Sequence, residues 1–317
     1  MAWSLNITGC PKLVTEGEQS MCKGMGGLFP SGASEPGGSA EERSLASEQA
    51  RIPDGRLQTG ALIINADDWG RNRDTTNRTL ECVRNGTVSS VSAMVFMDDS
   101  QRAASTAVGG GIDAGLHLNF TTHFSAPGAA PALIEHQQRL CGYLRWHRLA
   151  QIMFHPGLVR SFEYVVLSQI DEFHRLYGRA PDRLDGHHHM HLCANVLIGR
   201  LLPAGTIVRR NFSFRPGEKS FGNRLYRKVV DGALARRHRL TDFFFALPPI
   251  EPESRLQSIF SLARQSVVEM ETHPINAEEY RFLERGEIFR WTGSTRLVSF
   301  RSFFPPCSVV ESQLVPS

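Results

Sequence analysis

The segment Ala61-Leu-Ile-Ile-Asn-Ala-Asp-Asp-Trp-Gly70 joins an apolar run to two adjacent carboxylates and a glycine. This pattern predicts a buried strand that delivers acidic side chains at its carboxyl end. Adjacent carboxylates suit a division of labour, because one can bind a cation while its neighbour accepts a proton from water. The alternative is an Asp-Asp turn followed by a helix cap, which is the commoner structure at this dipeptide.

On the carboxyl side of this segment, helix-like and strand-like patterns alternate. Motifs at successive strand ends can converge when the strands are parallel and curl toward one mouth. The sequence therefore predicts an α/β fold, a distorted (β/α) barrel of mainly parallel strands with its site at the C-terminal strand ends. Strands are predicted at 61–66 and 88–96, and helices at 74–84, after Asp98 and at 161–177, which precedes the strand carrying Asp185.

The segment Arg183-Leu-Asp-Gly-His-His-His-Met-His191 packs four histidines and an aspartate into nine residues. Metal chemistry readily explains this density, although a surface patch, a buried hydrogen-bonded network or an adventitious metal site would also contain histidines. An extended segment would place Asp185, His187, His189 and His191 on one face and His188 on the other. A tight turn at Gly186 would instead select His187 as the main ligand and leave its neighbours to bind substrate or support the ligands.

The segment Ile112-Asp-Ala-Gly-Leu-His-Leu-Asn-Phe-Thr121 alternates so that His117 and Asn119 share a face. A lone histidine in this position would more often be a core residue. Joined to Asp68 and His187, however, His117 completes a set of two histidines and one carboxylate. That set is a recurrent arrangement for a divalent ion that keeps open water positions.

A fourth piece, Val267-Val-Glu-Met-Glu-Thr-His-Pro274, is a short apolar strand that ends in a polar residue and a histidine. The His273 imidazole has an ordinary pKa close to neutrality, so it can act as an acid or a base if it faces the cleft.

The order and the residues of these segments resemble those of the YdjC-like carbohydrate deacetylases. This family includes diacetylchitooligosaccharide deacetylases and hopanoid-associated relatives. The resemblance covers roughly residues 60–303. Several such motifs in the same order rarely coincide by chance. They are Asn65-Ala-Asp-Asp-Trp-Gly70, Asn85-Gly-Thr-Val-Ser-Ser-Val-Ser92, Gly115-Leu-His-Leu-Asn-Phe-Thr121, Asp185-Gly-His-His-His-Met-His191 and Glu271-Thr-His-Pro274.

The resemblance implies a barrel that removes N-acetyl groups from an amino sugar or oligosaccharide with the help of one divalent metal ion. The family suggests magnesium, and imidazole ligands also suit zinc. The implied roles are Asp68, His117 and His187 as metal ligands, Asp67 as catalytic base and His273 as catalytic acid. We also expect Asn119, His189 and Arg209 to contact the substrate.

Two departures from the family pattern bear on the substrate. Trp69 stands where phenylalanine is more usual, and 122–131 lacks the family's Gly-x-Pro spacing, so the sequence leaves the identity of the sugar open.

The region 200–239 is strongly basic, and Glu218 and Asp231 are its main acidic residues. A solvated helical face is the expected explanation, and an anionic substrate such as a phosphorylated or lipid-linked sugar is the alternative. Nucleic acid is disfavoured because aromatic stacking partners are not regularly interleaved. Two alternative functions stay open: a metal-dependent phosphoesterase, for which the basic region would bind the phosphate, and a noncatalytic sugar- or metal-binding protein. The basic residues include Arg209, Arg210, Arg215, Lys219, Arg224, Arg227, Lys228, Arg236 and Arg237.

Composition permits this interpretation without selecting it. The chain has 317 residues, 41% of them hydrophobic, and a net charge of +3, so it can bury a core and does not demand a polyanionic partner. No apolar run reaches the length of a membrane span. The six cysteines lack Cys-x-x-Cys spacing, which favours reduced thiols in a cytoplasmic protein. A homodimer is left open.

The chain divides into three predicted regions. Residues 1–58 are rich in Gly, Ser and Glu without a sustained apolar period, which predicts a disordered, low-complexity extension. This extension lacks the charged leader and apolar stretch of a secretory signal. Residues 59–305 form the predicted deacetylase domain, and 306–317 form a C-terminal tail.

Overall fold

The computed structural model describes residues 60–146, 149–214, 218–293 and 295–305. The predicted extension over 1–58 and the tail over 306–317 lie outside these described residues. Within the described part of the chain, no helix combines the length and the apolar character that a membrane crossing needs.

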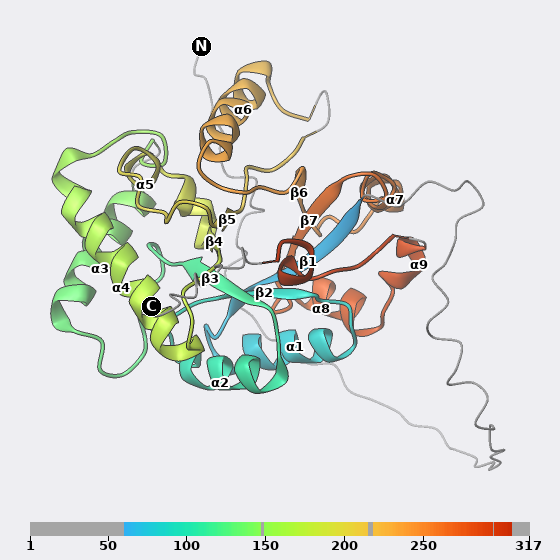
Figure 1. Cartoon of the computed structure of the whole chain (residues 1–317), viewed down its shortest axis with the longest axis horizontal. Coiled ribbons are helices and arrows are strands. Elements are labelled where there is room, and N and C mark those ends of the chain that lie inside the picture. Colours follow the sequence, from blue (N-terminus) through green and yellow to red (C-terminus); the bar gives the residue numbers. More distant parts are fainter. Residues whose placement is uncertain (1–59, 147–148, 215–217, 294, 306–317) are drawn as a thin grey trace, which may run out of the picture. The chain divides into compact units, whose positions relative to one another are not determined.

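Seven strands form one sheet in which every pairing is parallel, in the order β5-β4-β3-β2-β1-β7-β6. The two outer strands approach each other, because the Val208 amide donates to the Arg239 carbonyl at 2.9 Å and the Ser213 amide donates to the Phe244 carbonyl at 2.8 Å. The sheet thus curls into the predicted distorted (β/α) barrel (Figure 1). The strands are β1 Ala61–Trp69, β2 Ser90–Ala93, β3 Ala114–Leu118, β4 Arg183–Gly186, β5 Ile207–Val208, β6 Phe243–Ala246 and β7 Val267–Thr272.

Helices connect these strands and lie around the outside of the sheet (Figure 1). The predicted helices at 74–84 and 161–177 are confirmed with one or two more residues at the amino end, whereas the strand predicted at 88–96 is shorter. The helices are α1 Arg73–Arg84, α2 Ser100–Gly110, α3 Pro131–Trp146, α4 Val159–Tyr177, α5 Ala194–Ile198, α6 Phe221–Ala235, α7 Glu253–Leu262, α8 Ala277–Glu284, α9 Phe289–Thr292 and α10 Phe300–Phe303, with short 3-10 helices η1 Pro156–Leu158 and η2 His187–Leu192.

Local sequence explains where the first helix begins and how α4 packs. The Asn72 side chain caps α1 by accepting a hydrogen bond from the Thr75 amide at 2.9 Å. Gly178 ends α4 with φ 68°, a left-handed conformation that favours glycine. The α4 residues that face inward recur every three or four positions, as an amphipathic helix requires. They include Phe162, Val165, Val166, Gln169 and Phe173.

The alternation of side chains along β1 and β7 separates the apolar core from the barrel interior. Leu62, Ile64, Val268 and Met270 belong to the large core under the helices. The alternate residues on these strands face the interior, which is apolar at the amino end of the strands, where Ile63 packs in a second cluster with Phe300 of α10. The carboxyl end is left for polar groups, as in other barrels with parallel strands.

Candidate active site

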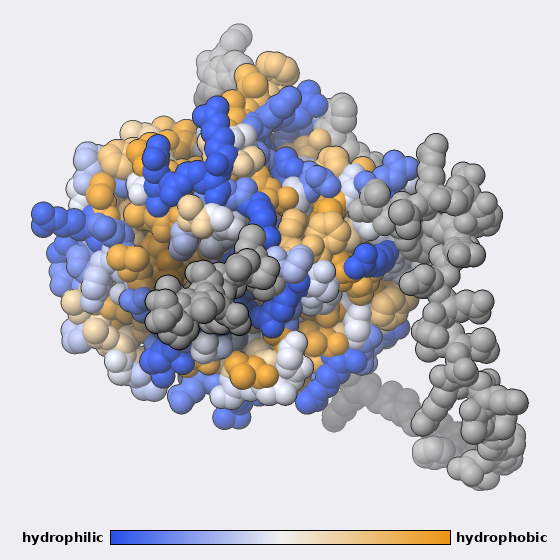
Figure 2. Space-filling model, viewed as in Figure 1, coloured by the Kyte–Doolittle hydropathy of each residue, from blue (hydrophilic) through white to orange (hydrophobic). Residues whose placement is uncertain are grey.

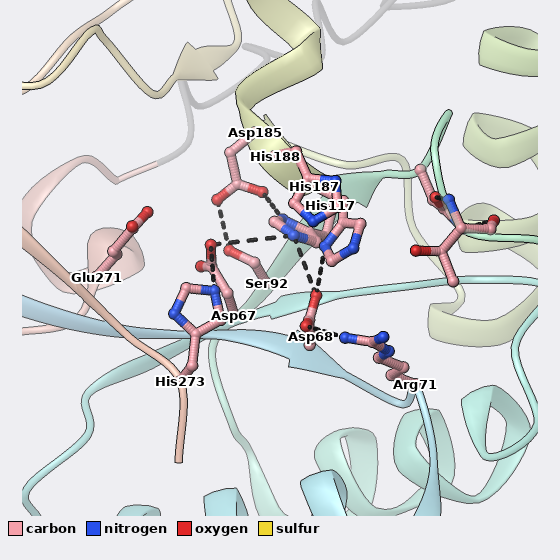
Figure 3. A network of polar contacts seen from close by, with 12 residues as sticks. Asp67, Asp68, Arg71, Ser92, His117, Asp185, His187, His188, Glu271 and His273 are labelled. Carbon is pink, nitrogen blue, oxygen red and sulfur yellow. Dashed lines mark hydrogen bonds and ion pairs between the residues drawn. The ribbon is translucent and has the colours of Figure 1, made fainter. Parts of the chain in front are cut away.

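Side chains from four strand ends meet at the carboxyl end of the barrel (Figure 3). Asp67 and Asp68 come from β1, His117 from β3, His187 from the turn after β4, and His273 from the residue after β7. The sequence motifs that were predicted to converge are therefore brought together.

The adjacent residues Asp67 and Asp68 both reach this site because β1 is irregular. In a regular strand, neighbouring side chains point to opposite faces. The pairing of β1 with β2 shifts register between Ala66 and Trp69, and Asp68 has φ 63°, in the left-handed region that aspartate tolerates better than most residues. A local bulge of this kind redirects a side chain.

The triad of Asp68, His117 and His187 forms a compact group of buried potential ligands, all within 4.8 Å of one another. Asp68 Oδ1 lies 2.9 Å from His187 Nδ1 and 3.4 Å from His117 Nε2. Among the described residues, Asp68 Oδ1 and His187 Nε2 have no hydrogen-bond partner of normal geometry. Buried polar atoms without partners are costly, so this donor set fits a bound cation.

The electrostatics of the triad also favour a cation. Burial raises the pKa of the Asp68 carboxyl, but His187 and His117 outweigh burial and hold that pKa well below its usual value. Burial lowers the pKa of His117, yet the charges of Asp67 and Asp185 raise it to about 10. A surrounding potential that binds a proton this tightly also attracts a metal ion, which would compete with that proton.

The histidine-rich segment turns immediately after Gly186 instead of continuing as a strand, so the prediction of one shared face for its alternate residues is wrong. A Cβ atom at Gly186 would lie 2.9 Å from the His191 amide nitrogen, which explains the glycine. His188 and His189 follow with φ 54° and 57°. The alternative prediction, a turn that directs His187 toward Asp68, agrees with the structure.

The other histidines of the segment have different surroundings. His188 Nδ1 lies 2.9 Å from Thr121 Oγ1. His191 Nε2 donates to the Arg209 carbonyl at 2.9 Å, and burial lowers the pKa of His191 to about 3, so it is neutral. His189 is partly exposed, with 27% of its side chain accessible, and its ring lies 4.6 Å from Phe212. It thus stays available for the predicted substrate contact.

Asp185 orients His117. Its Oδ1 atom lies 2.8 Å from His117 Nδ1, so the imidazole donates from Nδ1 and turns Nε2 toward Asp68. Burial raises the pKa of Asp185, but Arg209, His117 and Arg183 outweigh burial and lower it. The carboxylate therefore stays ionised and fixes the orientation of the His117 ring.

Arg209 joins four carboxylates in the barrel interior and is 2% exposed. Its Nη1 and Nη2 atoms each lie 2.7 Å from an Asp67 oxygen. Its Nε donates to Glu269 at 2.6 Å, while Glu271 and Asp185 lie at 3.2 and 3.0 Å. Sequence reasoning missed Glu269 and Glu271 as members of the site. The signal was present, since two acids alternating within an apolar strand must face an interior that holds a cation.

Two predicted substrate contacts have other surroundings. Arg209 does not lie on the solvated face predicted for 200–239; it is buried behind Asp67, because interior carboxylates need a cation. Asn119 is fully buried, and its side chain holds the loop after β3 by donating to the Thr122 carbonyl and accepting from the Thr121 and Thr122 amides. These contacts favour supporting roles for both residues.

His273 lies across the site from the triad, with Nε2 3.9 Å from Asp67 Oδ2 and its side chain 31% exposed. Its amide donates to Glu279 at 2.8 Å, which fixes the backbone after β7. Burial lowers the pKa of His273, but the charges of Asp67, Glu271 and Asp68 raise it above its usual value. These charges therefore favour the protonated form of His273, whose side chain stays partly exposed.

The chain is similar to proteins of known family. A chitooligosaccharide deacetylase of Serratia marcescens is 34% identical over 137 residues, which are 41% of this chain and 50% of that protein, so the chain spans about half the length of this relative in the match. A chitooligosaccharide deacetylase of Escherichia fergusonii is 26% identical over 251 residues, which are 71% of this chain and 95% of that protein.

Among solved structures, an Enterococcus faecalis V583 protein provisionally described as a cellobiose-phosphate cleavage protein has a similar fold. Its TM-score is 0.55 at 18% identity, over 77% of this chain and 98% of that chain. A model of the YdjC-like protein family matches residues 61–286, which include every residue of the site described above. The chain therefore belongs to the YdjC-like protein family.

Proposed function

We propose that this protein is a metal-dependent carbohydrate deacetylase, which hydrolyses the N-acetyl group of an amino sugar or oligosaccharide to acetate and a free amine. The observation that carries the proposal is the buried triad Asp68, His117 and His187, with unpartnered ligand atoms, beside a carboxylate and a histidine suited to proton transfer. The similar proteins of Serratia marcescens and Escherichia fergusonii, both named as chitooligosaccharide deacetylases, support the same activity.

The triad would hold one divalent cation. When bound, the ion would polarise the amide carbonyl and lower the pKa of the attacking water. Two imidazoles and one carboxylate suit zinc, and a site completed by water also accepts the magnesium suggested by the family resemblance. The second group of close potential ligands, Asp67, His117 and Asp185, shares His117 with the triad. Because Arg209 already pairs with Asp67 and Asp185, the second group is disfavoured as a site for another ion.

Asp67 is proposed to accept the proton of the attacking water. Arg209 contacts both of its oxygens, and the Asn65 side-chain Nδ2 donates to Oδ1 at 2.8 Å. Burial raises the pKa of Asp67, but Arg209 and His117 outweigh burial and lower it. The carboxylate is therefore ionised and held in one orientation, as a positioned base requires.

His273 is proposed to protonate the departing amine. An unprotonated amine is a poor leaving group, so the carbon–nitrogen bond breaks only when a proton arrives at the nitrogen. The raised pKa of His273 favours the protonated imidazole that would donate this proton. Because His273 and Asp67 lie close together, both can address one acetamido group, and His189 at the rim would contact the sugar.

Acetate release tests the proposal most directly. The full-length protein is incubated with a panel of N-acetylated oligosaccharides, with and without a chelator, and with p-nitrophenyl phosphate as a competing substrate class. We expect acetate release that the chelator abolishes and that added divalent metal restores. Release of phosphate without release of acetate would instead support a phosphoesterase, and bound metal without turnover of either class would support a binding protein.

We further propose that the protein works in the cytoplasm. Cys82, Cys141 and Cys193 are free and buried in the structure, as expected where thiols stay reduced.

A further inference from the structure

Helix α6 turns its largest apolar residues toward solvent. Phe221 is 73% exposed, Leu225 50% and Val229 63%, and their spacing of four residues places them along one side of the helix. Figure 2 shows apolar side chains over α6, at the top of the view. Exposed apolar groups in a continuous row indicate an interaction surface more strongly than scattered ones do.

The inward side of α6 makes this arrangement unusual. The buried residues of the helix include Asn223, Arg227 and Asp231, with Val230 and Leu234 as the apolar ones. A helix that served only to cover the barrel would have the opposite distribution, with large apolar residues inward and charges outward. The outward row therefore needs an occupant other than the barrel.

The charges on the exposed side select that occupant. Lys228 lies next to the apolar row and is exposed, and Arg236 follows at the end of the helix. The one acidic residue within α6, Asp231, is buried and paired with Arg210 at 2.9 Å. A second copy of this chain packed on the same row would bring like charges together, whereas an anionic lipid surface would complement them.

We propose that the exposed side of α6 docks on the surface of an anionic lipid membrane. The helix would lie parallel to the surface, with Phe221, Leu225 and Val229 in the boundary between headgroups and acyl chains and Lys228 and Arg236 near lipid phosphates. Because α6 follows β5, at whose carboxyl end Arg209 enters the active site, docking would hold the barrel beside the membrane. The inference does not depend on the proposed reaction.

Vesicle co-sedimentation of the full-length protein tests the inference. Vesicles of phosphatidylglycerol mixed with phosphatidylcholine are compared with vesicles of phosphatidylcholine alone, across a series of salt concentrations. We expect binding to the anionic vesicles that weakens as salt rises, because screening removes the attraction of the basic side chains. Val229→Glu should lower partitioning at least about tenfold, since it places a negative charge within the apolar row.

Val108 provides the matched control, because it is the same residue type, 60% exposed, on the outside of α2. Val108→Glu should leave vesicle binding unchanged. The proposal is overturned if the wild-type protein stays in the supernatant with anionic vesicles, or if the two variants bind equally. It is also overturned if sedimentation velocity shows a dimer that Val229→Glu dissociates, which would assign the row to a second copy of this chain.

Discussion

The two halves of the active site meet their electrostatic needs in different ways. In the half built by β1, β3 and the turn after β4, Asp68 and His187 carry buried ligand atoms without hydrogen-bond partners among the described residues. In the half built by β5 and β7, Arg209 binds Glu269, Glu271 and the oxygens of Asp67. The first half thus offers ligand atoms to a partner from outside the chain, while the carboxylates of the second half share the Arg209 guanidinium.

Because of this difference, substitutions of a metal ligand and of Arg209 should have different effects. Removing a ligand from the first half should abolish metal binding at a smaller cost to the fold, because each ligand makes few internal contacts, such as the Asp68–Arg71 ion pair or the contact between His117 and Asp185. Removing Arg209 from the second half should destabilise the fold, because several carboxylates would stay buried without a positive charge beside them. The variants below test this division.

The largest expected effect is loss of the metal. Asp68→Ala, His117→Ala and His187→Ala should each leave almost no bound divalent ion after dialysis and no measurable acetate release, because a three-ligand site cannot hold its ion with two ligands. Metal content by inductively coupled plasma mass spectrometry checks this outcome, and circular dichroism checks the fold. His174→Ala on the exposed side of α4 is the control. Full metal content in a folded His187→Ala protein would reject this ligand set.

Proton transfer should fail without loss of metal. Asp67→Asn and His273→Ala should each lower kcat by about 10² to 10⁴-fold with a smaller change in KM, since each removes a proton carrier. The pKa of His273 is raised, so the acid stays protonated above its ordinary value of 6.5 and the rate should fall only as pH rises further. That alkaline limb should be missing from the kcat profile of His273→Ala. A wild-type kcat in this variant would contradict the acid role.

Loss of the buried Arg209 guanidinium should lower the stability of the fold. Arg209→Met should lower the free energy of unfolding by about 3–5 kcal/mol, because it leaves Asp67, Glu269 and Asp185 buried near one another without their shared partner. Urea unfolding followed by circular dichroism measures this change. Arg160→Met, on the exposed surface of α4, is the matched control. Equal stability of the two variants would show that the cluster is solvated in solution.

A smaller effect should appear in the pH dependence of stability. Burial raises the pKa of Glu269 to about 7, against the opposing charge of Arg209. Between pH 4.5, its ordinary pKa, and 7, the folded protein then binds more protons at Glu269 than the unfolded chain does, so its contribution to stability falls as pH rises. Glu269→Gln should remove this decline and raise Tm near pH 8 by about 2–4 °C relative to wild type. Thermal unfolding across this range, with the exposed Glu253→Gln as control, measures it.

The same division marks how far the sequence could predict the site. The triad half was predictable because each ligand stands in a short motif at a strand end, and parallel strands bring such ends together. The cluster half was predictable only in part: the alternation of Glu269 and Glu271 in β7 indicates acids in the interior, but no motif pairs them with Arg209, which lies 60 positions from Glu269. Local alternation placed Asn119 beside His117, but a loop hydrogen-bond pattern decided its orientation. The left-handed backbone of His188 and His189 has no signal in the sequence, since neither residue is a glycine.

The irregular end of β1 sets a condition for anyone who designs such a site. Two consecutive acids copied onto the end of a regular strand would send one side chain into the barrel and the other into the helix layer, where a charge is poorly tolerated. A designed barrel would therefore need the shifted register and the left-handed Asp68 together with the two acids. The transferable unit is a backbone shape that carries two residues, and searches for new hydrolase scaffolds could screen for that shape before any side chain is chosen.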